Sequence, residues 1–432
     1  MWDYYNDKTI FITGGTGFLG TAIVYRLLTQ TSVCRVYMLC RGGIGKLRLK
    51  WTESLSLATV EKLLSTNRIT AINGDILSPD LGLSQDELST LRQEVNVIIH
   101  SASSINLGKP LGALSDVIIR ASERMVDIAL TCPSLDRFVY ISTAYCNSHL
   151  FPTNEDIEVE IKEDIYDPSH HSNVMKEWAQ VKESGSSDAY EAHDFPWSYG
   201  YAKNLTERIL LHRFTQSDVK DKLLIMRPSV IGPAQSFPDF KYNVPLSSPL
   251  TKIAAIIALS PAGMVTAAIK AVEKSSQVFI DEVPVDVVVD RLLAHLAVGT
   301  NGCVHAVSGQ RERHKFIKWW ESVASIRRLP GKFDLNWKEL DWKSYEQHPL
   351  PRFYVIFGTS FGFREDKTVA LSRHPLVESC KELQLFTNVN LGGQLLSRTE
   401  DVYSMMNHIA KNDAPARAII ELYYQDVIKA KL

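Results

Sequence analysis

The sequence has 432 residues, of which 45% are hydrophobic, and its 47 basic residues nearly balance its 49 acidic residues to give a formal charge of -2. A chain of this length and apolar content can bury a sizeable core, which excludes an intrinsically disordered protein. The balanced charge argues against a protein that binds nucleic acid or an anionic membrane surface through its net charge.

The six cysteines are scattered along the chain and form no C-x-x-C pair. A disulfide framework is therefore not expected, and the prediction is a reducing compartment, the cytoplasm. The first residues, MWDYYNDKTIFITGG, lack a basic n-region and lead directly into a strand pattern, so no signal peptide is expected. No set of His, Cys and carboxylate residues has the spacing of metal ligands, so no metal site is expected.

The first 145 residues alternate between short apolar strands and amphipathic helices. Strands are predicted at 9–13, 33–40, 69–73, 95–99 and 137–141. Helices are predicted from the glycine run through Leu28, near 60–64, and at 111–130. This alternation implies right-handed crossovers and a parallel sheet covered on both faces, which is a Rossmann-type doubly wound α/β fold.

The rest of the chain divides into three parts. Residues 148–195 are rich in Asp, Glu, His and Ser, and we interpret them as an insertion or lid. A helix at 199–214, a strand at 223–226, a helix at 285–296 and a strand at 303–307 then restore the alternation. The charged run at 310–315 predicts a boundary between a domain of residues 1–310 and a smaller, mostly helical C-terminal region of residues 311–432.

The first predicted strand and helix are joined by TGGTGFLG, in which Gly14, Gly17 and Gly20 are spaced as G-x-x-G-x-x-G. Glycine lets the backbone turn tightly and approach a pyrophosphate, and the helix N-terminus supplies free N–H groups. This context between strand and helix predicts dinucleotide binding by residues of the loop, with a tight turn that binds no ligand as the alternative. The residues predicted to contact the cofactor are Gly14, Thr16, Gly17, Phe18, Leu19 and Gly20.

The second strand ends in Cys40-Arg41 and carries no acid there. A carboxylate at this point favours NAD, whereas an arginine can pair with the 2′-phosphate of NADP. Arg41 therefore favours NADPH, with Lys46 and Arg48 as further sources of positive charge. The alternative is a solvated surface arginine.

Short polar or small residues follow the third and fourth strands. Asp75 is placed to meet the adenine amino group, with Ile76 beside it. Ser101 and Ala102 are small enough for the cofactor to lie close to the backbone. We therefore predict that these four residues bind the cofactor.

Tyr199 and Lys203 are four residues apart at the start of a predicted helix, so their side chains share one face. A lysine ammonium beside a tyrosine hydroxyl favours the phenolate and lowers the tyrosine pKa from ~10. The pair is therefore predicted to exchange a proton with a carbonyl or alcohol, and Lys203 also to hold the nicotinamide ribose. The alternative is an exposed helix pair, because Y-x-x-x-K is common by chance.

Hydroxyl groups follow the strand at 137–141, where ligands of open α/β sheets bind. Thr143 or Ser142 would hydrogen-bond the reacting oxygen and stabilise its developing charge. After the next strand, Pro228, Ser229 and Ile231 would pack against the nicotinamide ring. The order along the chain is glycine loop, hydroxyl strand, Tyr-Lys helix and proline strand.

This order resembles the extended short-chain dehydrogenase/reductase family. More narrowly, the sequence is similar to the fatty acyl-CoA reductases and the thioester reductase domains of carboxylic acid reductases, the group once called male-sterility proteins. The resemblance covers about residues 1–310. The segments that carry it are TGGTGFLG (13–20), VYMLCRG (36–42), NVIIHSAS (96–103), FVYISTAYCN (138–147), EDIYDP (163–168), SYGYAKNLTE (198–207), IMRPSVIGPA (225–234) and IDEVPVDVVVD (280–290).

The resemblance implies NADPH-dependent reduction of an acyl thioester, acyl-CoA or acyl-carrier protein, to an aldehyde and/or a primary alcohol. It makes Thr143 the hydroxyl member, Tyr199 the proton donor and Lys203 its partner, with Ser142 as the competing hydroxyl. Relatives often carry an asparagine near Ile118, so that contact is not expected here. The resemblance also implies that residues 1–310 bind NADPH and that 311–432 bind substrate.

Two readings of the apolar segments stay open. The aromatic residues beyond 311 either line an acyl tunnel or form core, and density of this kind favours core. The apolar stretch 246–269 is interrupted by Pro261 and Gly263, so it is too broken for a membrane-spanning helix. A buried helix pair is expected there, with an acyl portal or a peripheral contact at a membrane edge as the alternative.

Three functions therefore compete. The first is thioester reduction. The second is another extended short-chain reductase, of ketone or hydroxysteroid type, or a sugar-nucleotide epimerase, and Arg41 opposes an epimerase with tightly bound NAD. The third is a non-catalytic NADPH-binding sensor, which the presence of both Tyr199 and Lys203 opposes.

Overall fold

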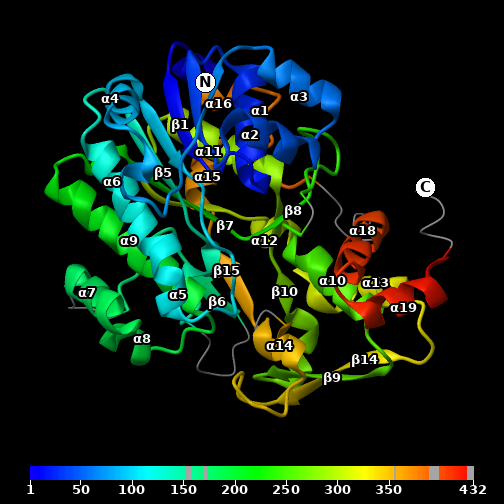
Figure 1. The fold of residues 1–432 in the computed structure, drawn as a ribbon. Coiled ribbons are helices and arrows are strands. Elements are labelled where there is room, and N and C mark those ends of the chain that lie inside the picture. The colour runs from blue at the N-terminus through cyan, green and yellow to red at the C-terminus, as the bar shows by residue number, and fades with distance from the viewer. Residues whose placement is uncertain (151–157, 169–172, 245, 355–356, 389–397, 426–432) are drawn as a thin grey trace.

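The centre of the molecule is a seven-stranded parallel sheet with the strand order β12-β7-β5-β4-β1-β2-β3 (Figure 1). The computed structural model describes residues 1–150, 158–168, 173–244, 246–354, 357–388 and 398–425. The sheet confirms the predicted Rossmann-type doubly wound α/β fold. Its strands are β1 (Thr9–Thr13), β2 (Arg35–Leu39), β3 (Ile69–Ile72), β4 (Val97–His100), β5 (Arg137–Ile141), β7 (Leu223–Pro228) and β12 (Gly302–Ala306).

Helices cover both faces of this sheet because successive strand side chains point to opposite sides. Ile10 and Ile12 pack in one core cluster with α1 (Phe18–Gln30), α2 (Gly43–Thr52), α3 (Leu57–Leu64) and α11 (Val285–Ala297). Phe11 points the other way, into a cluster with α4 (Gln85–Glu94), α6 (Ala121–Leu130) and α9 (Ser198–Gln216). The strand order reverses beside β1, and a crevice is expected at the carboxyl ends of the strands there.

The predicted helix at 111–130 is present but irregular. It consists of α5 (Leu111–Ser115), a π-helical turn at Asp116–Arg120 and then α6. Ile118 is buried inside the π-helical turn, which packs against α9. Such turns occur frequently at functional sites.

The segment 148–195 contains β6 (Glu158–Ile161), α7 (Val174–Ser184) and α8 (Asp188–Glu191). Trp178 of α7 is fully buried against Tyr201 and Leu205 of α9, on the side of that helix away from the sheet centre. The description of this segment as an insertion or lid stays a prediction.

A second hydrophobic core lies beside the sheet, at the lower right of Figure 1. It draws residues from both sides of residue 310, so the predicted domain boundary is crossed by a shared core and stays a prediction. The aromatic residues Trp319, Trp320 and Phe357 lie in this core. The elements that build it are α10 (Pro249–Leu259), β9 (Gly263–Ile269), α13 (Phe316–Ile326), β14 (Phe333–Glu339), α18 (Thr399–Ala410) and α19 (Ala414–Tyr423).

The expected helix pair at 246–269 is wrong in its second half. The helix α10 ends before Pro261, and the chain continues as the strand β9, which pairs in parallel with β14. The partner strand begins at Phe333, too far along the sequence for a local pattern to reveal it. The C-terminal region likewise contains β15 (Ser360–Phe363), which pairs with β6.

Apart from short 3-10 helices, the remaining elements of the described residues are short strands and α-helices. They are β8 (Val230–Gly232), β10 (Phe279–Ile280), β11 (Glu282–Pro284), α12 (Gly309–Glu312), β13 (His314–Lys315), α14 (Pro349–Phe353), α15 (Asp366–Leu371) and α16 (Pro375–Glu378). Among the described residues, no helix has the length and apolar character needed to cross a membrane. All six cysteines are free thiols, and the cytoplasmic location stays a prediction.

Candidate active site

A cavity of about 800 Å³ opens at the carboxyl ends of the central strands. It brings together the residues that the sequence nominated for cofactor binding or catalysis, with the exception of Arg48. These residues are Gly14, Thr16, Gly17, Phe18, Leu19, Gly20, Arg41, Asp75, Ile76, Ser101, Ala102, Ser142, Thr143, Tyr199, Lys203, Pro228, Ser229 and Ile231. Their placement is a fact of the structure, whereas their roles stay predictions.

The cavity has two halves that differ in chemistry. The dinucleotide half is formed by the glycine loop, the ends of β2, β3 and β4, and the lysines of α2. The apolar half is formed by six residues that belong to the second core or pack against it: Leu107, Tyr145, Trp197, Val230, Ile253 and Tyr354. Ser142, Thr143, Tyr199 and Lys203 lie between the halves.

The glycine loop lines the dinucleotide half, and three of its positions require glycine. Gly14 has a φ of +75°, and a Cβ there would lie 2.7 Å from the amide nitrogen of Ala102. A Cβ on Gly20 would collide with the carbonyl of Gly14. Gly17 is the N-cap of α1, so the free N–H groups of that helix begin at the loop. A side chain at Gly14 or Gly20 would push the backbone segments of the loop and of residues 101–102 apart, so glycine keeps the tight turn that brings backbone N–H groups to a pyrophosphate.

The positive charges of the dinucleotide half come from Arg41 and from one face of α2. The Arg41 side chain is 80% exposed, and its Nη1 lies 3.8 Å from Oδ2 of Asp75. Lys46 and Lys50, one helical turn apart, both line the cavity. Arg48 instead pairs with Glu61, away from the cavity, so the expectation for Arg48 is wrong and Lys50 takes that place.

Burial raises the pKa of the Tyr199 phenol, and a side-chain hydrogen bond with Thr143 opposes this shift only in part. The lowered tyrosine pKa expected from Lys203 is therefore wrong for the structure as it stands. The Lys203 ammonium donates to the carbonyl of Ile141 at 2.8 Å and lies 5.9 Å from the Tyr199 ring centroid. Tyr199 is thus held as a neutral phenol, the form that can donate a proton.

Lys203 is fully buried in the wall of the cavity. Desolvation lowers the pKa of Lys203 to about 7, and the nearby carboxylate of Glu207 opposes this shift. The Lys203 ammonium lies 4.6 Å from the centroid of the Tyr140 ring, a cation–π distance. Near neutral pH the lysine therefore exchanges readily between its charged and neutral forms.

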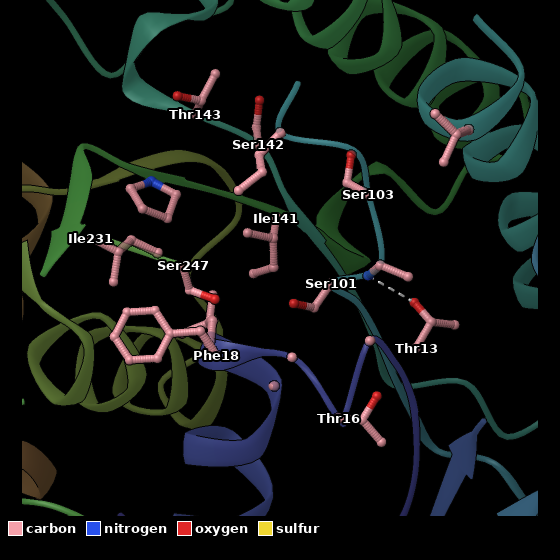
Figure 2. Close-up of a pocket in the computed structure, with 18 of the residues that line it drawn as sticks. Thr13, Thr16, Phe18, Ser101, Ser103, Ile141, Ser142, Thr143, Ile231 and Ser247 are labelled. Carbon is pink, nitrogen blue, oxygen red and sulfur yellow. Dashed lines mark hydrogen bonds between the residues drawn. The ribbon is translucent and has the colours of Figure 1, made fainter. Parts of the chain in front are cut away.

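The two candidate hydroxyls differ in their surroundings. Thr143 Oγ1 accepts from the backbone N–H of Tyr145 at 3.3 Å and also contacts Tyr199. Ser142 Oγ is buried and has no hydrogen-bond partner within the described residues. Figure 2 shows Ser142, Thr143 and Ser103 along one side of the cavity, with Thr16 and Phe18 of the glycine loop across from them. The Ser142 side chain lies in the cavity wall with its hydroxyl oxygen buried, so its role as a partner of the reacting oxygen stays a prediction.

Sequence reasoning reached part of the apolar half: Tyr145 and Val230 lie inside the quoted segments, and Ile253 and Tyr354 lie in the stretches offered as an acyl portal and an acyl tunnel. Leu107 and Trp197 escaped it. Trp197 immediately precedes α9, and its indole N–H donates to the carbonyl of Phe353 at 2.8 Å. That bond places Tyr354 of the C-terminal region in the cavity wall. No local signal links residues so far apart in the sequence. Within the part of the chain that the structure describes, no group of three metal-ligating side chains is present.

Comparison with known proteins gives one family match and several relatives. The family described as male sterility protein matches residues 12–292. A putative fatty acyl-CoA reductase of Drosophila melanogaster is 27% identical over 310 residues, covering 67% of this chain and 55% of the relative. Fatty acyl-CoA reductase 1 of Xenopus laevis is 25% identical over 308 residues, covering 68% and 55%. The chain thus spans about half the length of the curated relatives it matches.

Solved structures match the fold over almost the whole chain. The terminal R domain of the myxalamid PKS-NRPS pathway has a TM-score of 0.61 at 18% identity, covering 93% of this chain and 91% of that one. A nonribosomal peptide synthetase R domain of Mycobacterium tuberculosis has a TM-score of 0.60 at 17% identity, covering 92% of each chain. UDP-glucuronic acid 4-epimerase of Bacillus cereus, in complex with NAD, has a TM-score of 0.52 at 15% identity, covering 92% and 99%.

Proposed function

The chain belongs to the male sterility protein family, within the extended short-chain dehydrogenases/reductases, and from this premise we propose that it is an NADPH-dependent reductase of fatty acyl thioesters. The observation that carries the proposal is the two-part cavity. A groove suited to a dinucleotide meets an apolar half suited to an acyl chain, and the hydroxyls of Ser142, Thr143 and Tyr199 lie where they meet. The named activity of the relatives supports this choice of substrate.

The dinucleotide half fits NADPH in its cradle and in its charges. The glycine loop would hold the pyrophosphate, and Lys203 would hold the nicotinamide ribose. Arg41, Lys46 and Lys50 would surround the 2′-phosphate, and Asp75 would meet the adenine. Once bound, the cofactor would supply hydride to the carbonyl carbon of the thioester.

The protein's own groups would then handle the oxygen and the proton. The hydroxyls of Thr143 and Ser142 would hydrogen-bond the oxygen as negative charge develops on it. Tyr199, a neutral phenol because burial raises its pKa, would donate its proton to that oxygen. Breaking the C–S bond would release the thiol and leave an aldehyde. A second hydride and proton would convert the aldehyde to a primary alcohol.

The cavity disfavours the competing functions. Among the described residues, the charged ones that line it are Arg41, Lys46, Lys50, Asp75 and Lys203, and none of these belongs to the apolar half. A nucleotide-sugar substrate would bring a diphosphate and several sugar hydroxyls, which fit poorly against a wall that is mainly apolar. The presence of Tyr199, Lys203 and the two hydroxyls in one site opposes a sensor that performs no chemistry.

The experiment is NADPH oxidation with a long-chain acyl-CoA, with the products identified by mass spectrometry. The expected products are free CoA together with an aldehyde or alcohol, and the hydride count distinguishes the two. Oxidation only with a free aldehyde would contradict thioester reduction while leaving the Tyr-Lys chemistry in place. Oxidation with carrier-bound acyl groups alone would identify the carrier protein as the substrate.

A further inference from the structure

A buried histidine that the proposed reaction does not use lies directly behind the dinucleotide half. His100 ends β4, and its register partners on the neighbouring strands are Thr13 of β1 and Tyr140 of β5. The side chain of His100 is buried and does not line the cavity, whereas Thr13 and Ala102 do. His100 therefore reaches the cavity only through its neighbours.

Four hydrogen bonds form a chain that passes through the His100 ring, and all four donate in the same direction along it. The Ala102 N–H donates to Thr13 Oγ1 at 3.2 Å, and the Ser122 hydroxyl donates to the carbonyl of Ile118 at 2.6 Å. Between these ends, Thr13 Oγ1 lies 2.8 Å from His100 Nδ1, and His100 Nε2 lies 3.2 Å from Ser122 Oγ.

The fixed ends determine the tautomer of the ring. Ser122 donates its single hydroxyl proton to the carbonyl of Ile118. The proton between Ser122 Oγ and the ring must therefore belong to Nε2 of His100. Burial lowers the pKa of His100 to about 3, with the charge of Lys203 as the second cause, so the ring is neutral. Nδ1 is then an acceptor, and it receives the hydroxyl proton of Thr13. Every donor in the chain has one acceptor.

This chain of bonds joins two segments whose separation sets the shape of the dinucleotide half. Thr13 immediately precedes Gly14, and Ala102 follows the end of β4. The two backbones are already so close that a Cβ on Gly14 would lie 2.7 Å from the Ala102 nitrogen. The dashed line beside Thr13 in Figure 2 is the bond that connects them. At its other end the chain reaches Ile118, beside Val117 in the cavity wall.

We propose that His100 is a positioning residue for dinucleotide binding, whose neutral ring directs the Thr13 hydroxyl so that the glycine loop and the Ala102 backbone are held at a fixed spacing. The inference rests on the dinucleotide part of the proposed function and is independent of the acyl substrate. Loss of the ring would free the Thr13 hydroxyl to rotate, and the backbone of the groove would have to be ordered again when the cofactor binds.

The test is the dissociation constant of NADPH, measured by fluorescence titration on the purified full chain. His100→Phe and Thr13→Val are each expected to weaken NADPH binding about tenfold, the equivalent of one or two buried hydrogen bonds. Thr13→Ser keeps a hydroxyl that accepts from Ala102 and donates to His100, so it is expected to restore the affinity. The double variant His100→Phe/Thr13→Val is expected to bind no more weakly than either single variant, because both break one chain.

His295 provides a matched control. It is also a buried histidine, bonded to Thr300 at 3.0 Å and to Thr368 at 3.1 Å, but it lies in α11 and away from the cavity. His295→Phe is expected to lower the melting temperature as His100→Phe does, yet to leave NADPH affinity unchanged. Should His100→Phe fail to fold, the comparison of Thr13→Val with Thr13→Ser decides the question.

Two results would overturn the inference alone: wild-type affinity in His100→Phe or in Thr13→Val, or additive losses in the double variant. A wild-type chain that binds neither NADPH nor NADH would overturn the proposed function, and this inference with it. The two failures are distinguishable because the first requires a wild-type chain that binds the cofactor.

Discussion

The two halves of the cavity are assembled in different ways. The dinucleotide half comes from short motifs at the ends of neighbouring strands, such as residues 13–20 after β1 and 101–103 after β4. The apolar half comes from Leu107, Tyr145, Trp197, Val230, Ile253 and Tyr354, which are spread over most of the chain. The difference follows from their chemistry. Phosphates require bare backbone and positive charge at defined spacings, whereas an acyl chain requires only apolar area, which has no motif.

The halves also differ in how they are held. The strands of the dinucleotide half are hydrogen-bonded to one another in a single sheet. The apolar half is supported by the second core and by individual bonds such as that from Trp197 to Phe353. Variants in one half are therefore expected to leave the other half intact, and the predictions below test that separation.

The largest effect is expected at Tyr199, where the halves meet. Tyr199→Phe removes the proposed proton donor and is expected to lower kcat by about a thousandfold or more, with NADPH affinity retained. Tyr201→Phe is the matched control, because its hydroxyl bonds Glu177 at 3.0 Å and lies outside the cavity. Steady-state kinetics and NADPH titration measure both variants. Unchanged turnover in Tyr199→Phe would remove this residue from the mechanism.

The next effect belongs to the apolar half. Leu107→Asp places a charge where the acyl chain would lie, and the loss of about 2 kcal/mol of apolar contact is expected to raise KM for a long-chain acyl-CoA about thirtyfold. The KM for NADPH is expected to stay unchanged. Leu107→Met keeps the apolar volume and serves as the control. An equal rise in both KM values would show that the halves are not independent.

A variant of Lys203 tests whether water is excluded from the part of the cavity where the two halves meet. The pKa of Lys203 in the folded chain, about 7, is lower than in the unfolded chain, so above pH 7 the unfolded state binds a proton that the folded state lacks. The contribution of this group to the free energy of unfolding of the wild type therefore rises with pH above pH 7, by at most about 1.4 kcal/mol per pH unit. Below pH 7 Lys203 is charged in both states, and the folded state carries the full free-energy cost of burying that charge. The free energy of unfolding of Lys203→Met, relative to that of the wild type, is therefore expected to be highest at pH 6 and progressively lower at pH 8 and 9.

Denaturant unfolding of both proteins across that pH range measures the difference in free energy. Subtracting one protein from the other removes the titration of groups that the two share. A difference that is the same at every pH would show that Lys203 keeps an ordinary lysine pKa in the folded protein.

The smallest effect concerns Lys50 in the dinucleotide half. Lys50→Ala is expected to raise KM for NADPH about fivefold and to leave KM for NADH unchanged, because the contact proposed for Lys50 is with the 2′-phosphate at an exposed site. Arg48→Ala is the matched control on the same helix, since Arg48 pairs with Glu61. An equal rise for NADPH and NADH in Lys50→Ala would contradict the assignment of the 2′-phosphate site.

Local sequence chemistry was sufficient for the sheet and for the glycine loop of the dinucleotide half. The predicted bounds of β1 and β5 are those of the structure, and the glycine loop lies between strand and helix as expected. These features depend on residues that are close together in the sequence. Runs of apolar residues form buried strands, and a glycine exposes the backbone at its own position. The family could be recognised for the same reason, since its motifs are contiguous.

Tertiary structure alone decided the rest, because burial and long-range neighbours have no local pattern. Lys50 rather than Arg48 lines the cavity because of the way α2 is oriented toward it. Residues 263–269 form the strand β9 because β14 lies beside them as a pairing partner. Burial also reversed the expected direction of the pKa of Tyr199. Thr13 and His100 are separated by 87 residues, yet they share one hydrogen bond because parallel pairing of β1 and β4 places them side by side.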